Sequence, residues 1–269
     1  MAVSERNRLG VGGANKLSAL ESQLNANDGP LRGCQPFGAI DGRYVQVPAD
    51  NLLFCAGENW VATEVGTSGS KIVTAPTATL PLRLLYTSGT AGAGDGLNLQ
   101  FALAATLGST SRTSIGTMFP AAGRILAGEM RFRITTTVNN CEMFFGLATA
   151  ADTTMLSSAG AITVTELVGI RKLRSSALAA GSMSVTGPTT TATVLAPAAT
   201  IVVNTWHTIG FRVNGISSVE YWFDGDVTGE STVTNIPVGA LNPALVFQAA
   251  TAAAATIEIA GIWYGMENY

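Results

Sequence analysis

The chain has 269 residues, of which only 12% are charged, and its formal net charge is −3. In a soluble domain about 25% of residues are charged, so this surface lacks much of the charge that keeps a monomer in solution. We therefore expect the outer face to be covered by other subunits in a homo-oligomer. Lysine and arginine form no run, which argues against a nucleic-acid partner.

The first residues, MAVSERNRLGVGG, lack the apolar stretch of a secretory signal, and no apolar run is long enough to cross a bilayer. We expect synthesis in the cytoplasm and no membrane partner. The three cysteines, Cys34, Cys55 and Cys141, are widely spaced and form no CxxC motif. This usage predicts buried free thiols.

Residues 1–80 are predicted to form an N-terminal arm. Within it, residues 14–27 place Leu17, Leu20 and Leu24 at the i, i+3, i+7 spacing of a short amphipathic helix. So short a helix is marginal alone, and its leucines are predicted to pack either on their own domain or on a neighbouring subunit. From about residue 30 onwards, frequent glycine and proline predict an extended arm with short strands.

Residues 81–269 contain a series of short strand-like runs separated by turn residues, with no helical spacing. Such a series predicts an all-β, antiparallel two-sheet sandwich that forms one domain. The runs are 81–87, 97–105, 128–137, 141–149, 161–171, 182–187, 199–205, 207–215, 219–225, 243–251 and 255–265.

Alternation along residues 206–225 predicts two adjacent strands with one inward row each, because side chains of a strand point to opposite faces in turn. The inward rows are Ile209, Phe211 and Val213, then Val219, Tyr221 and Phe223. Trp222 falls on the outer face, where it could carry a sugar, anchor a subunit interface or join a second core layer. We favour coverage by residues 30–80 or by a neighbouring subunit, so Trp222 joins Leu17, Leu20 and Leu24 as a candidate interface residue.

The same stretch offers little for catalysis. His207 is the only histidine, no GxSxG motif accompanies it, and a zinc site with two histidines is excluded by the count. Glu220 and Asp224 share a strand face but lie about 13 Å apart. Glycoside hydrolysis needs carboxylates about 5 to 9 Å apart. Asp224 and Asp226 are too few ligands for calcium. We expect no catalytic residue, metal or cofactor, and no enzyme.

Six segments in order carry a family resemblance: GEMRFRI, NNCEMFFGLATADTT, VGIRKLRSS, NTWHTIGFRVNGISSVEYWFDGDVTG, NIPVGALNPALVF and IEIAGIWYG. Their order resembles the concanavalin A-like lectin/glucanase jelly roll, in the laminin-G-like form common among bacteriophage structural proteins, over about residues 81–269. The clustered acids of the glucanases, roughly E-x-D-x-x-E, are absent, and so are calcium loops rich in Asp and Asn. The resemblance implies a jelly roll used for its surfaces.

Three functional hypotheses follow. We favour a non-enzymatic virion structural protein, a capsid decoration or cement protein that binds and stabilises the shell of a tailed phage. It would be made in the host cytoplasm, sit on the capsid exterior, contact the major capsid protein and form a homotrimer. The alternative is a carbohydrate-binding module of a tail fibre or spike, with Trp222 and either Trp206 or Trp263 stacking on surface glycans. A glucanase-like hydrolase is less favoured.

Overall fold

The computed structural model describes residues 43–47, 60–66, 69–74, 83–90, 92–101, 103–104, 112–113, 118–136, 140–149, 155–157, 164, 166–172, 182–186, 193–194, 200–227, 231–232 and 235–268. The chain divides into two units, Met1–Ala39 and Ile40–Tyr269, and all described residues belong to the second. The helix predicted for residues 14–27, with Leu17, Leu20 and Leu24, lies outside the described residues. Its packing therefore stays a prediction.

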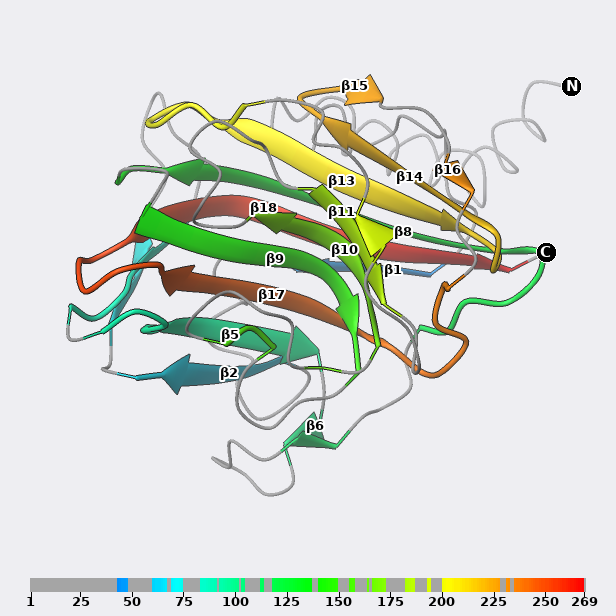
Figure 1. Ribbon diagram of the computed structural model, residues 1–269, viewed down its shortest axis with the longest axis horizontal. Coiled ribbons are helices and arrows are strands. Elements are labelled where there is room, and N and C mark those ends of the chain that lie inside the picture. The colour runs from blue at the N-terminus through cyan, green and yellow to red at the C-terminus, as the bar shows by residue number, and fades with distance from the viewer. Residues whose placement is uncertain are drawn as a thin grey trace, which may run out of the picture. The chain divides into compact units, whose positions relative to one another are not determined.

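Two antiparallel sheets form the described part of the protein, which confirms the predicted all-β jelly-roll sandwich (Figure 1). The first, sheet A, has the order β15 (Asp226–Val227), β14 (Ser218–Phe223), β13 (His207–Asn214), β8 (Arg124–Ile134), β18 (Thr256–Asn268), β4 (Arg83–Thr87) and β3 (Ser70–Thr74). Two further strands join it: β1 (Arg43–Val47) pairs with β18, and β16 (Ser231–Thr232) pairs with β14. No helix in the described ranges is long and apolar enough to cross a bilayer.

The second sheet, sheet B, lies across the core from sheet A. Its order is β12 (Thr193–Val194), β11 (Ser182–Thr186), β10 (Leu167–Lys172), β9 (Cys141–Ala148), β17 (Asn242–Ala249), β5 (Gly96–Phe101) and β2 (Trp60–Val65). Figure 1 shows β9, β17, β5 and β2 side by side in this layer. A separate short pair consists of β6 (Leu103–Ala104) and β7 (Arg112–Thr113).

Strands from within residues 1–80 are hydrogen-bonded into both sheets. β1 pairs with β18 and β3 pairs with β4 in sheet A, whereas β2 pairs with β5 in sheet B. Pairing with partners far along the chain fixes these strands to the sandwich. A domain boundary at residue 80 stays a prediction.

One predicted strand is wrong. Residues 200–206, which cover most of the run 199–205, form a loop with a turn instead. The carbonyl of Val202 accepts a hydrogen bond of 3.2 Å from the backbone N–H of Thr205, and Asn204 between them has a φ of 63°. Asparagine tolerates this left-handed conformation, and short apolar runs do not by themselves distinguish a strand from other structure.

The core between the sheets follows the alternation read from the sequence. Both inward rows of the β13–β14 hairpin are buried, and so are Met130, Phe132 and Ile134 of β8. At its centre the ring of Phe145 from sheet B packs on Phe211 and Tyr264 from sheet A, with ring centroids 5.7 and 5.3 Å apart. Each such fully buried side chain contributes about 1.5 to 3 kcal/mol.

Candidate functional site

The chain segment 206–225 brings its only histidine beside an aspartate at one end of the sandwich. His207 begins β13, and Asp224 follows the last residue of the neighbouring β14. Asp224 and Gly225 have φ values of 53° and 89° and form the two-residue turn between β14 and β15. Positive φ at both central positions is the requirement of a type I′ hairpin turn, which favours an Asp-Gly pair.

The hydrogen bonds of His207 fix its tautomer. Its Nε2 lies 2.9 Å from the backbone nitrogen of Val202, which can only donate, so Nε2 must accept. The ring proton therefore lies on Nδ1, which donates to Oδ2 of Asp224 over 2.7 Å. The other oxygen of Asp224 accepts a bond of 2.7 Å from the backbone N–H of Thr208. The carboxylate thus holds both the ring and the start of β13.

This arrangement gives His207 a structural role. The ring is 4% exposed and packs between Phe132 and Phe223, with centroid distances of 6.1 and 4.8 Å. In a Ser-His-Asp relay the second ring nitrogen must be free to take a proton from the nucleophile. Here that nitrogen is occupied by the Val202 backbone.

The other carboxylates considered from the sequence have separate partners. Glu220 lies 3.5 Å from the guanidinium of Arg212, whereas Asp224 binds His207. The side chain of Asp226 lies outside the described residues. Within the described ranges, no group of three or more His, Cys, Asp or Glu side chains could hold a metal ion.

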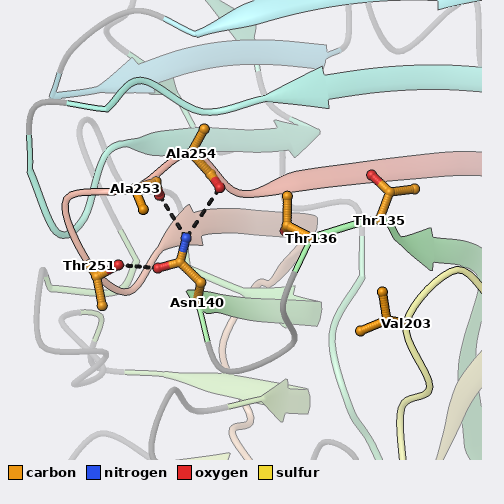
Figure 2. A pocket seen from close by; sticks show the side chains of 7 residues that line it. All are labelled: Thr135, Thr136, Asn140, Val203, Thr251, Ala253 and Ala254. Carbon is orange, nitrogen blue, oxygen red and sulfur yellow. Dashed lines mark hydrogen bonds between the residues drawn. The ribbon is translucent and has the colours of Figure 1, made fainter.

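A pocket of about 720 Å³ opens beside Val203, which lies in the turn before β13 (Figure 2). Three loops line it: the segment after β8, the turn before β13 and the connection between β17 and β18. The lining residues are Thr135, Thr136, Asn140, Val203, Thr251, Ala253 and Ala254. Val203 follows Val202 directly, so the histidine contacts the same turn that lines the pocket.

Asn140 ties two of these loops together. Its Nδ2 donates to the carbonyls of Ala253 and Ala254 over 2.7 and 3.2 Å, and its Oδ1 accepts from the hydroxyl of Thr251 (Figure 2). Asn140 also accepts a bond of 2.9 Å at its backbone carbonyl from the N–H of Ala250. The loop between β17 and β18 is therefore held before any ligand arrives.

The described residues that line the pocket combine small apolar groups with hydroxyls and an amide, and none of them is charged. The hydroxyl oxygen of Thr136 accepts a bond of 3.1 Å from the backbone N–H of Thr256, so its own proton is left to donate. Methyl groups of Val203, Ala253 and Ala254 provide apolar surface between these polar groups. A few placed polar groups on an apolar lining suit a small ligand, and the lack of charge among these described residues disfavours an ion.

Trp222 lies on the outer face of sheet A, as predicted, but has only 1% of its surface exposed. Its cross-strand partner is Gly210, where an added Cβ would lie 2.0 Å from the indole. Its Nε1 donates a bond of 3.0 Å to Oε2 of Glu129. The ring therefore has no exposed face on which a sugar could stack. Its assignment to a subunit interface stays a prediction.

Trp206 and Trp263 are the other tryptophans considered for sugar stacking. Trp206 is half-buried, and the guanidinium groups of Arg131 and Arg133 lie 5.5 and 5.0 Å from its ring. Cations already occupy this aromatic surface. The side chain of Trp263 lies outside the described residues.

Sequence reasoning missed the pocket and the His207–Asp224 contact. Two signals were present. The tract TAAAAT at 251–256 supplies small side chains that leave space at a loop, and Asn139–Asn140 is the kind of dipeptide found in turns. Neither signal shows that the two loops meet.

The described residues form a β-sandwich with a pocket between loops, and the comparisons support the fold. No family model and no curated protein matches the sequence. A protein of unknown function from Shewanella oneidensis MR-1 has a similar structure, with a TM-score of 0.55 and 11% identity over 86% of this chain and 89% of that chain.

A second similar structure is the binding domain of botulinum neurotoxin DC in complex with SialylT. Its TM-score is 0.51 with 10% identity, over 84% of this chain and 48% of that chain. This chain thus spans about half the length of that protein. At such low identity these likenesses show a shared sandwich fold and nothing of the ligand.

Proposed function

We propose that this protein is a non-catalytic binding module that recognises a neutral carbohydrate in the pocket around Thr135, Thr136 and Asn140. The observation that carries the proposal is the set of described residues that line the pocket: they offer hydroxyls, an amide and methyl groups, and none of them is charged. Sugar hydroxyls both donate and accept hydrogen bonds, and sugar rings present apolar C–H groups. The lining matches both properties.

The open pocket is suited to weak binding at a single site. Affinity then comes from presenting several copies together, because linked sites raise the effective concentration of the second contact. The scarcity of charge, 12% of residues, favours a homo-oligomer that would supply those copies. A trimer would present three equivalent pockets.

A glycan array with the full-length protein tests this proposal, with the variant Thr135→Val as the decisive comparison. The hydroxyl of Thr135 makes no hydrogen bond within the described structure, and the backbone bond of 3.1 Å from its N–H to Thr256 does not depend on the side chain. Loss of one hydrogen bond to the ligand should weaken binding about fivefold without changing the melting temperature.

Ser217→Ala is the matched control, because it removes a hydroxyl from the turn between β13 and β14. This turn follows Asn214, which pairs with Ile125 near the start of β8. The pocket residue Thr135 instead follows the last residue of β8, Ile134. The control is therefore at the opposite end of the strands. The control should bind like the wild-type protein. The proposal is wrong if the wild-type protein binds no neutral glycan, or if Thr135→Val binds as tightly as the control.

The second candidate function is a structural component of a tailed-phage virion that decorates the capsid exterior and contacts the major capsid protein. The surface favours it: besides the low charge, Val202, Ile216 and Val238 are 52%, 46% and 65% exposed. Purified protein should then bind its cognate shells and raise their resistance to heat. If electron microscopy finds the protein on the tail, or finds none on the particles, a role in decorating the capsid shell is excluded.

A hydrolase remains the least favoured function. Its test is the release of reducing sugar from β-glucans, compared between the wild-type protein and Glu220→Gln. We expect no release from either.

A further inference from the structure

Among the described residues, three hydrogen bonds fix the turn that lines one side of the pocket. The N–H of Thr205 donates to the carbonyl of Val202 over 3.2 Å, and the N–H of Asn204 donates to the carbonyl of Ile134 over 2.9 Å. The third is the bond of 2.9 Å from the N–H of Val202 to Nε2 of His207. Only this third bond depends on a side chain, and that side chain can take up a proton.

We propose that His207 is a positioning residue for the pocket: the neutral imidazole holds the 202–205 turn in its ligand-binding position, and protonation of the ring shifts the turn out of it. The effect on ligand binding rests on the proposed carbohydrate site. The hydrogen bond between Val202 and His207, which we call the latch, is present in the protein without ligand. It makes recognition depend on pH although none of the described residues that line the pocket is charged.

The chemistry follows from the two ring nitrogens. A neutral imidazole has one donor and one acceptor, whereas the protonated ring has two donors and no acceptor. The N–H of Val202 would then face an N–H of the ring. The carbonyl oxygen of Val202 lies 3.3 Å from the same Nε2. Protonation thus exchanges the partner of Nε2 from the N–H to the carbonyl of one residue, which moves the peptide and the adjacent Val203.

Asp224 keeps the ring in place during this exchange. Its carboxylate contacts Nδ1, which carries a proton in both states, and it stabilises the positive charge of the protonated ring. The aromatic rings of Phe132 and Phe223, which flank the imidazole, carry no charge. Protonation therefore changes the Val202 side of the ring and leaves the Asp224 side intact.

The other charged groups near this end of sheet A are occupied elsewhere. Arg131 and Arg133 flank Phe132 on β8 but point to the opposite face, where they lie over Trp206. Arg133 also pairs with Glu258 of β18 at 2.6 Å. The 200–206 loop itself contains no charged residue. The charge of His207 is thus balanced by Asp224 alone among the described residues that contact it.

NMR of the full-length protein without ligand tests the latch directly. The ¹⁵N signals of the His207 ring and the amide signal of Val202 are followed from about pH 8 to about pH 5, the range in which histidine changes charge. At the upper end the ring should show the tautomer with its proton on Nδ1. The Val202 amide should then shift with the same midpoint as the ring. A ring that titrates while the Val202 signal stays constant overturns the proposal.

Glycan binding at the two ends of that range supplies the functional measurement. The wild-type protein should bind about fivefold more weakly at the acid end, because the exchange of partners at Nε2 moves Val203 from its place in the pocket lining. His207→Gln should bind equally at both ends, since its amide both accepts and donates but does not titrate. Equal pH dependence in both proteins overturns the proposal. If no glycan binds, the carbohydrate site fails and the NMR titration still decides the latch.

Discussion

Trp222 donates a hydrogen bond of 3.0 Å from its indole nitrogen to Oε2 of Glu129, whose side chain has no exposed surface. The two residues belong to β14 and β8, and β13 lies between these strands in sheet A. The indole therefore crosses β13, directly over Gly210. One side chain thus links three strands on the outer face of the sheet.

Replacing Trp222 by Phe should lower the free energy of unfolding by about 1.5 to 3 kcal/mol, because a buried carboxyl group loses a hydrogen-bond donor. Urea denaturation of the full-length protein measures this change. In a Glu129→Leu background, which offers the indole N–H no acceptor, the same substitution should cost less. Equal costs in the two backgrounds would show that the hydrogen bond contributes nothing and that the indole stabilises by packing alone.

Gly210→Ala should destabilise the protein by about 1 to 3 kcal/mol through overpacking. An added Cβ would lie 2.0 Å from Cζ2 of Trp222, so the indole would have to move. Gly92→Ala is the matched control, since the nearest atom to its Cβ, Oδ1 of Asp95, would lie 3.9 Å away. Combining Gly210→Ala with Trp222→Leu should recover part of the loss. A Gly210→Ala protein as stable as the Gly92→Ala control would contradict the placement of the indole.

The sandwich could be predicted from the sequence because alternation is a local property. The inward rows of β13 and β14 follow from the period of two along each strand, and both are buried in the core. Alternation also places Trp222 on the outer face. It cannot say what lies over that face, so the burial of the indole and its bond to Glu129 needed the structure.

The candidate site could not be predicted, because its parts meet through long-range pairing. Along their own strand, Asp224 and Glu220 are predicted to lie about 13 Å apart, which is too far for two carboxylates that act together. The true partner of Asp224 is His207 on the neighbouring strand, where the register Ile209↔Phe223 brings the two residues together. The apolar residues of 199–205 predicted a strand, but residues 200–206 form a loop with a turn.

Cys141 should resist alkylation in the folded protein. The side chain is buried without a disulfide, and burial raises the pKa of the thiol to about 11. Since the thiolate is the reactive form, a maleimide should label Cys141 at neutral pH only after denaturation. Peptide mapping by mass spectrometry separates this signal from those of Cys34 and Cys55. Labelling of Cys141 as fast in the native protein as in denaturant would contradict its burial.

Lys172 should make the stability of the protein depend on pH in the alkaline range. It ends β10 on the core face, in line with Val168 and Ile170, and donates from Nζ to the carbonyl of Cys141 over 2.8 Å. Burial lowers the pKa of its ammonium group below the ordinary value. At pH values between the folded-state pKa and about 10.4, the ordinary value, the unfolded chain binds more protons than the folded chain. The free energy of unfolding should therefore rise with pH across this window.

Replacing Lys172 by Met should remove that rise, because the unbranched apolar side chain fills similar space and does not titrate. Denaturation curves of both proteins between about pH 7 and about pH 10 measure the difference, and each unit of pKa shift corresponds to about 1.4 kcal/mol. Ile170→Val, a change in the same strand that does not titrate, should run parallel to the wild-type curve. If Lys172→Met also runs parallel to it, the ammonium group has the same pKa in both states and is not buried as the structure places it.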